Sequence, residues 1–218
     1  MPAPAKSCAA IILAAGASTR LGAPKQLLLL NGESLLRRTV RIALEAGCSP
    51  VLAVLGAHAE EMLPELEGLN ATAVLNPEWR LGMSTSVQAG LAKLLSLNPS
   101  GSRSESPFGS PSAISWAKDA LLLVCDQPAT TPALLQRLIE AHGQASLPIT
   151  ACRYSETLGV PAVFSSLVFP ELLELTGDQG ARRVIARSPA RVAAVDFPGG
   201  ASDIDTPEDV QMLGLESR

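Results

Sequence analysis

Short runs of apolar residues without polar alternation constrain the fold of this chain most strongly. The run Ala9–Leu13 has the length and bulk of a strand buried on both faces, and Val51–Leu55 and Ala71–Leu75 are similar. Between these runs, residues 34–46, with Ser34 as the N-cap, and residues 57–66 have helical patterns. Residues 26–30 have the pattern of a short extended piece, followed by a turn at Asn31 and Gly32. Strands that alternate with helices in this way predict an α/β fold with a parallel sheet.

Length and charge narrow the class of protein further. The 218 residues suit one domain, residues 1–218, with a sizeable core. The net charge of -4 disfavours nucleic acid as a partner. No apolar run approaches the roughly 20 residues of a membrane helix, so we expect a cytoplasmic protein without a membrane partner. Residues 98–115 are rich in Ser, Pro and Gly and predict a flexible insertion, which either covers a site or is surface padding.

The cysteines give no sign of a metal site or a disulfide framework. Cys8, Cys48, Cys125 and Cys152 are scattered along the chain, and no C-x-x-C pair occurs. We therefore expect reduced and mostly buried thiols. Only two histidines are available as partners for a nucleophilic cysteine, so this kind of catalysis is disfavoured.

The first apolar run leads into a loop of small and basic residues. Ala14, Ala15 and Gly16 leave little side chain between the backbone and a ligand, and backbone N–H groups of such a loop can bind an anion. Arg20 and Lys25 add positive charges, so the loop predicts a site for a nucleoside triphosphate. The alternative is an ordinary turn with two solvated charges. The spacing fits neither a Walker A loop nor G-x-G-x-x-G, which disfavours a kinase or an NAD enzyme.

Carboxylates occur at positions that helix capping does not explain. An apolar strand ends in Asp126, although the helix that follows already has an N-cap at Thr131. Residues 206–209 have the pattern of a capping box at the last helix, which leaves Asp203 and Asp205 unexplained. A buried carboxylate is costly unless it is paired or binds a cation, and Mg²⁺ prefers hard oxygen ligands. Asp126 is therefore a candidate metal ligand, and both Asp203 and Asp205 are left without a role in helix capping.

The residues from Leu13 to Lys25 read Leu-Ala-Ala-Gly-x-Ser-x-Arg-x-Gly-x-x-Lys. This pattern resembles the signature of the MobA-like nucleotidyltransferases, and most closely that of the molybdenum cofactor cytidylyltransferases; it departs only at Leu21, where the family more often has Met. The resemblance implies a Rossmann-like three-layer α/β/α fold of the nucleotide-diphospho-sugar transferase type, with a mostly parallel central sheet. It implies that Lys25 and Arg20 are catalytic and act on the phosphates. The residues that it assigns to the nucleotide in this loop are Leu13, Ala14, Ala15, Gly16 and Ser18.

Three further segments extend the resemblance to the nucleotide and the metal. Residues 76–87 resemble the family's N-P-x-x-x-x-G-M-x-x-S-V element, which implies that Gly82, Ser84 and Ser86 lie beside the nucleotide. The alternative for Ser84 is the N-cap of a helix. The residues Asp126-Gln127-Pro128 resemble the Asp-x-Pro metal element. The stretch D-I-D-T-P-E-D at residues 203–209 implies that Asp205 is the second ligand of Mg²⁺.

The acceptor side carries two more matches. Residues 159–164 resemble the family's G-x-P-x-x-F segment, although a turn into a short strand explains them equally well. Residues 177–183 resemble a G-D-x-G-A-R motif, in which Asp178 is alternatively only a helix cap. The residues that the resemblance assigns to acceptor binding are Gly159, Pro161, Asp178, Gly180 and Arg182.

The resemblance implies transfer of CMP from CTP to the terminal phosphate of molybdopterin, with release of pyrophosphate. Such a reaction needs no side-chain nucleophile, because the acceptor phosphate is already an anion and catalysis reduces to positioning and charge neutralisation. Ala15 favours CTP, since the guanylyl branch more often has Leu-Ala-Gly-Gly. Two alternatives remain: a nucleotidyltransferase that acts on a sugar or polyol phosphate, and a non-catalytic chaperone that delivers the cofactor to a client molybdoenzyme.

Overall fold

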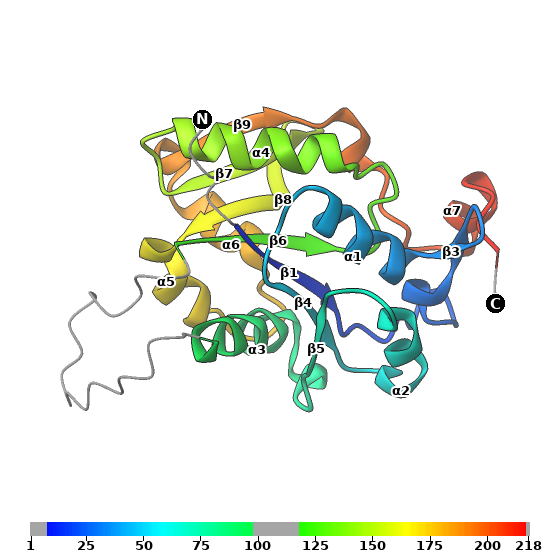
Figure 1. Ribbon diagram of the computed structural model, residues 1–218. Helices are drawn as coiled ribbons and strands as arrows, with labels where there is room; N and C mark the ends of the chain where they lie inside the picture. Colours follow the sequence, from blue (N-terminus) through cyan, green and yellow to red (C-terminus); the bar gives the residue numbers. More distant parts are fainter. Residues whose placement is uncertain (1–7, 98–117, 217–218) are drawn as a thin grey trace.

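A computed structural model describes residues 8–97 and 118–216. The predicted insertion at residues 98–115 lies outside the described residues. Seven strands form one sheet in the order β5-β4-β1-β6-β8-β7-β9 (Figure 1). The strands are β1 (Ala9–Ala14), β4 (Val51–Leu55), β5 (Thr72–Leu75), β6 (Asp119–Val124), β7 (Ile149–Tyr154), β8 (Thr157–Ser165) and β9 (Val192–Asp196).

The sheet is mostly parallel, as the sequence predicted. β1 pairs in parallel with β4 and β6, β4 with β5, and β7 with β9. β8 runs antiparallel to both of its neighbours, β6 and β7. Ser155 and Glu156, both at positive φ, connect β7 and β8 in a two-residue hairpin. Residues 159–164 lie inside the nine-residue strand β8, so the structural alternative for them was right about a strand but wrong about a turn and about the strand's length.

Helices cover both faces of the sheet (Figure 1). The helices α1 and α4 pack on one face, and α3, α5 and α6 pack on the other. Alternate residues of β1 face the two layers: Ile12 packs on the side of α1 and α4, and Ile11 packs on the side of α3, α5 and α6. Full burial of each side chain contributes about 2 kcal/mol to stability. The helices are α1 (Leu35–Glu45), α2 (Ala59–Met62), α3 (Met83–Ser96), α4 (Pro132–Gln144), α5 (Phe169–Leu173), α6 (Ala181–Arg187) and α7 (Pro207–Met212).

Several predicted helix starts are confirmed. The hydroxyl oxygen of Ser34 accepts from the N–H of Arg37 at α1, and that of Thr131 accepts from the N–H of Leu134 at α4. The capping box of residues 206–209 is present at α7.

Two predicted segments differ from the structure. The expected helix at residues 57–66 is split, because a 3₁₀ turn (Leu63–Leu66) with Pro64 follows the single turn of α2. The expected extended piece at residues 26–30 instead begins in the 3₁₀ turn η1 (Lys25–Leu27), ahead of the short hairpin of β2 (Leu29–Leu30) and β3 (Glu33–Ser34).

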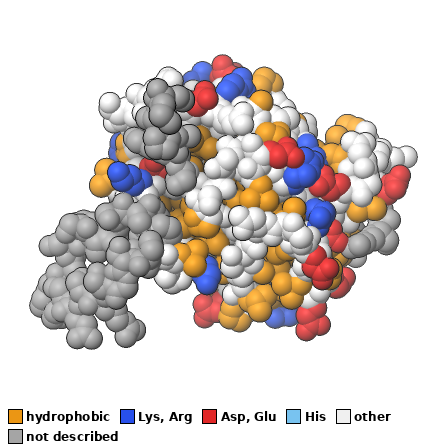
Figure 2. Space-filling model, in the orientation of Figure 1, with side chains coloured by type: hydrophobic (Ala, Val, Ile, Leu, Met, Phe, Trp, Pro, Cys, Tyr) orange, Lys and Arg blue, Asp and Glu red, His pale blue; other side chains and the backbone are white. Residues whose placement is uncertain are grey.

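All four cysteines are free and buried, which confirms the prediction of buried thiols. Burial raises the pKa of Cys48, Cys125 and Cys152 to about 12, so these groups are neutral thiols and poor nucleophiles. No helix among the described residues is long and apolar enough to cross a bilayer. On the face seen in Figure 2, basic and acidic side chains of the described residues are interspersed, without a broad basic area.

Candidate active site

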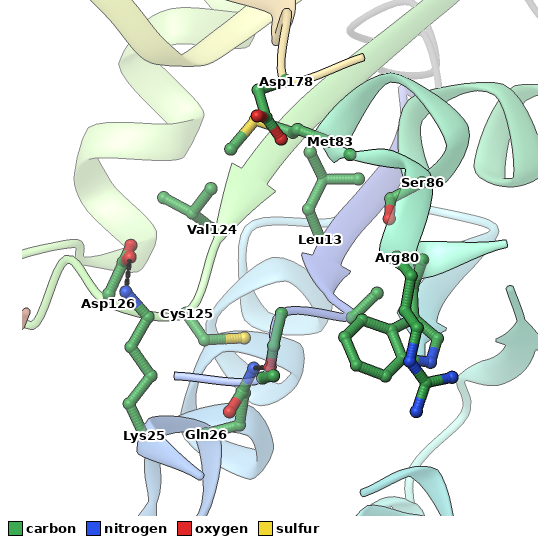
Figure 3. A pocket seen from close by; sticks show the side chains of 15 residues that line it. Leu13, Lys25, Gln26, Arg80, Met83, Ser86, Val124, Cys125, Asp126 and Asp178 are labelled. Carbon is green, nitrogen blue, oxygen red and sulfur yellow. Dashed lines mark hydrogen bonds and ion pairs between the residues drawn. The ribbon is translucent and has the colours of Figure 1, made fainter. Parts of the chain in front are cut away.

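A cavity of about 350 Å³ opens where β1 and β6 end at the carboxyl edge of the sheet. This edge is where open α/β sheets bind ligands. The strand ends contribute Leu13 and Val124, and the loop after β1 contributes Ala15, Gly16 and Ala17. Figure 3 shows Lys25 and Asp126 on one side of the cavity and Arg80 on the opposite side. The cavity thus has charged side chains on two opposite sides, with the apolar Leu13 and Val124 between them.

The ammonium group of Lys25 lies between two carboxylates. Its Nζ is 2.5 Å from Oδ2 of Asp126 and 3.0 Å from Oδ1 of Asp205, and it donates to the carbonyl oxygen of Ile204 at 3.2 Å. Burial has the largest effect on the pKa of Lys25 and lowers it, but the charges and hydrogen bonds of the two carboxylates together raise this pKa above its usual value. The ammonium group of Lys25 is therefore a fixed cation. The fold brings it together with Asp126 and Asp205, which are far from it in sequence.

Backbone contacts hold the two carboxylates close to each other. The N–H of Ile204 donates to the carbonyl oxygen of Asp126 at 3.0 Å, which ties the end of β6 to the segment before α7. The carboxylate of Asp209, a capping residue of α7, accepts from the N–H of Asp205 at 3.0 Å. The capping box therefore also positions Asp205.

Arg20 is a second cation beside this cluster. Its Nη2 lies 3.5 Å from Oδ2 of Asp205, and its side chain is 76% exposed. Arg20, Ser18, Lys25 and Asp205 line a smaller cavity of about 200 Å³, which shares Gly16 and Lys25 with the larger one. The structure thus brings together all four residues to which the sequence assigned catalysis and metal binding.

The start of α3 forms another wall of the cavity. Gly82 is the N-cap and offers no side chain, so the expectation that Ser84 caps this helix is wrong. Ser84 is buried at the second helical position, and its N–H donates to the carbonyl oxygen of Gly177 at 3.1 Å. Gly82, at φ +110°, approaches Gly177 so closely that an added Cβ would lie 2.3 Å from it. Ser86 lines the cavity and accepts from the Nδ2 of Asn76 at 3.0 Å.

Of the residues assigned to the acceptor, only Asp178 lines the larger cavity. It does not cap α6, which begins after Gly180 without a side-chain cap. Gly180 packs against Met83, where an added Cβ would lie 2.5 Å from the sulfur. Gly159 and Pro161 are buried in β8, and the exposed Arg182 donates to the hydroxyl of Thr157 at 2.7 Å. The structure therefore does not gather these residues into one site.

Several residues that line the cavity were absent from the predicted site. The guanidinium of Arg80 lies 4.2 Å from the centre of the ring of Trp79, and both residues line the cavity together with Met83. Trp79, Arg80 and Met83 lie in segment 76–87, which resembles the family's element beside the nucleotide, so this motif could have identified them from the sequence. Gln26 also lines the cavity, and its position next to Lys25 was its only signal.

Comparison with known proteins bears on what such a cavity does. The sequence profile of the MobA-like NTP transferase domain matches residues 10–192. The chain belongs to the MobA-like NTP transferase family. This family membership confirms the resemblance seen in the sequence, and the region matched includes the loop after β1, Asp126 and Asp178, but ends before Asp205.

Two relatives align with this chain over more than nine-tenths of their length, and their names indicate different activities. Nicotine blue oxidoreductase of Paenarthrobacter nicotinovorans is 29% identical over 93% of this chain and 91% of its own length. The purine catabolism protein PucB of Bacillus subtilis (strain 168) is 30% identical over 93% and 94%, respectively.

Solved structures share the fold along most of their length. Rv0371c of Mycobacterium tuberculosis H37Rv superposes with a TM-score of 0.76 at 29% identity, covering 96% of this chain and 98% of that one. Its complex with manganese gives a TM-score of 0.69 at 30% identity, with coverages of 95% and 97%. The 4-diphosphocytidyl-2C-methyl-D-erythritol synthase of Anaerococcus prevotii DSM 20548, at 15% identity and a TM-score of 0.65 with coverages of 96% and 95%, shows the shared fold alone.

Proposed function

We propose that this protein transfers CMP from CTP to the terminal phosphate of molybdopterin, or of its metal-loaded form, and releases pyrophosphate. The cluster of Lys25, Asp126 and Asp205 beside the loop after β1 carries the proposal. It combines a fixed cation with two carboxylates at the edge of the sheet where a triphosphate would lie. Membership of an NTP transferase family supports the donor half of the reaction.

The carboxylates of Asp126 and Asp205 fit a divalent cation. They already hold one cation between them, the ammonium of Lys25, and the carbonyl oxygen of Ile204 is a third hard oxygen at that point. Among the described residues, no group of three or more His, Cys, Asp or Glu side chains could hold a metal ion. Mg²⁺ nevertheless needs only one or two carboxylates when phosphates and waters complete its shell. The manganese complex of Rv0371c supports a divalent metal in this family.

Bound Mg²⁺ would neutralise the triphosphate and the pyrophosphate that leaves. The chain's own residues bind and position the substrates. The loop from Ala14 to Ser18 holds the nucleotide, Lys25 and Arg20 bind phosphate oxygens, and this fixes the α-phosphorus for in-line attack. Asp178 is proposed to accept hydrogen bonds from the acceptor, with Arg182 as a cation nearer the molecular surface. No protein nucleophile is needed, and the only cysteine in the cavity, Cys125, is protonated.

Pyrophosphate release tests this function directly. With Mg²⁺ and molybdopterin, we expect release from CTP in clear excess over GTP, ATP and UTP. If pyrophosphate were released with a sugar or polyol phosphate but not with molybdopterin, the acceptor would be the sugar or polyol phosphate, and the proposed acceptor would be wrong. No release with any acceptor, combined with binding of molybdopterin, would favour the cofactor chaperone. Because one relative is named an oxidoreductase, oxidation of NADPH in the same mixtures is the control for a different reaction class.

Gly16 offers a prediction that separates binding from folding. A Cβ at Gly16 would meet no atom within 4 Å, and Gly16 lines the cavity. We expect Gly16→Val to keep its thermal unfolding temperature but to weaken CTP binding at least about 10-fold, because the side chain occupies the space of the ligand. Isothermal titration with CTP and Mg²⁺ measures this. Gly143→Val is the matched control, since a Cβ there is equally unobstructed but lies in α4. Equal CTP affinity in both variants would remove Gly16 from the site.

A further inference from the structure

The side chain of Gln26 is almost fully buried beneath the loop after β1. Only 2% of the residue is exposed. Its Nε2 donates to the carbonyl oxygen of Ala14 at 3.1 Å and to that of Gly16 at 2.9 Å. Its Oε1 accepts from the hydroxyl of Ser18 at 3.4 Å. One neutral amide thus contacts three residues of the loop.

These contacts determine where the loop's carbonyl oxygens point. A carbonyl oxygen directed into the cavity would repel the oxygens of a triphosphate, and Gln26 holds two of them. The intervening carbonyl, that of Ala15, accepts from the N–H of Ala57 at 3.0 Å. Three successive carbonyl oxygens are therefore held by neighbouring donors.

Fixed carbonyl groups also fix the N–H groups that follow them. In a planar trans peptide, the C=O and the next N–H point in opposite directions. The N–H of Ala17 is consequently directed away from Gln26, and the N–H of Gly16 is directed away from Ala57. Gly16 and Ala17 both line the cavity, so their amides are available to an anion.

The same contacts connect the loop to the cationic cluster. The hydroxyl of Ser18 donates to Gln26 and accepts from the backbone N–H of Lys25 at 3.1 Å. Lys25 and Gln26 are neighbours in the 3₁₀ turn η1. The loop, the amide and the backbone of Lys25 therefore form one hydrogen-bonded unit.

We infer that Gln26 is a positioning residue for the triphosphate: it aims the amides of Gly16 and Ala17 and couples them to Lys25. This inference rests on the proposed function for the identity of the ligand, but it concerns only the polyphosphate part. A carboxylate at position 26 could not replace the amide, because it has no hydrogen to donate to two carbonyl oxygens. Preorganised amides bind an anion more tightly than amides that must first be oriented.

The test uses the full chain and inorganic tripolyphosphate with Mg²⁺ as the probe. Gln26→Met keeps the length of the side chain and removes its donors. Gln88→Met is the matched control, because Nε2 of Gln88 also donates to two carbonyl oxygens, those of Leu173 and Leu175, at 2.8 and 3.0 Å. Titration calorimetry gives the dissociation constants. Amide NMR shifts of Gly16 and Ala17 on titration report the contact itself.

We expect Gln26→Met to raise the dissociation constant of tripolyphosphate about 10-fold and to reduce the ligand-induced shifts at Gly16 and Ala17, with Gln88→Met unchanged. A dissociation constant within twofold of the wild type, or an equal loss in Gln88→Met, would overturn the inference. If Gln26→Met does not fold, Gln26→Asn retains a buried amide that is too short for both carbonyls, and the same criteria apply. If tripolyphosphate binding depended on Gln26 but the protein did not turn over CTP, the proposed function would be rejected and the inference about Gln26 would stand.

Discussion

Replacing Asp126 with Asn is expected to lower the kcat of nucleotidyl transfer about 100- to 1000-fold without loss of the fold. Asp126 is one of two carboxylates that hold a cation at the edge of the sheet, and an amide cannot supply its negative charge. The variant protein should still fold, because Asn can accept the hydrogen bond from Lys25 and the backbone contact between residues 126 and 204 does not involve the side chain. Initial rates of pyrophosphate release at saturating Mg²⁺ measure the effect.

Asp196→Asn is the matched control for this variant. Asp196 ends β9, its side chain is 76% exposed, and it pairs with Arg153 at 3.6 Å on the surface. Such exposed pairs have little energetic effect. We expect wild-type rates for Asp196→Asn, whereas a wild-type rate for Asp126→Asn would show that this carboxylate holds no essential metal.

Replacing Lys25 with Met is expected to have two opposite effects. Turnover should fall about 100-fold, because the triphosphate loses a charged partner. The affinity for Mn²⁺ in the absence of nucleotide should rise about 10-fold, since the ammonium that now lies between Asp126 and Asp205 no longer competes for their oxygens. Titration of free Mn²⁺ by electron paramagnetic resonance measures the second effect.

The rise in metal affinity distinguishes this explanation from simple damage to the site. Lys118→Met serves as the control, because Lys118 is exposed beside the opposite end of β6. We expect it to bind Mn²⁺ as the wild type does. If Lys25→Met bound Mn²⁺ no better than the wild type, Lys25 would not compete with the metal, and the two carboxylates would need another explanation.

Features that depend on neighbouring residues could be predicted from the sequence. The caps at Ser34 and Thr131 and the capping box of residues 206–209 involve partners three residues away, so the pattern contains all that is needed. The antiparallel direction of β8 was not predicted, because the two-residue hairpin that reverses the chain after β7 consists of Ser155 and Glu156, neither of which is a typical residue for a turn at positive φ. Ser84 was misassigned because Gly82, at positive φ, already turns the chain into α3.

In the candidate site, too, single residues could be identified from the sequence, but their arrangement in space could not. The sequence identified Lys25, Asp126 and Asp205 separately, but the position of the ammonium between the carboxylates arises from contacts across more than 100 positions. Gln26 was assigned to an extended piece, since its position beneath the loop follows from the 3₁₀ turn. Of the residues that the sequence assigned to the acceptor, only Asp178 lines the cavity, because Gly159 and Pro161 lie inside β8.

Transfer of the α-phosphate is the measurement that tests the proposed reaction most directly. The protein is incubated with Mg²⁺, molybdopterin and CTP that carries a radioactive α-phosphate, and the products are separated. We expect the label in a molybdopterin–cytosine dinucleotide, formed in equal amount with unlabelled pyrophosphate. Label that stays in CTP, or that appears only as free CMP, would contradict transfer to molybdopterin.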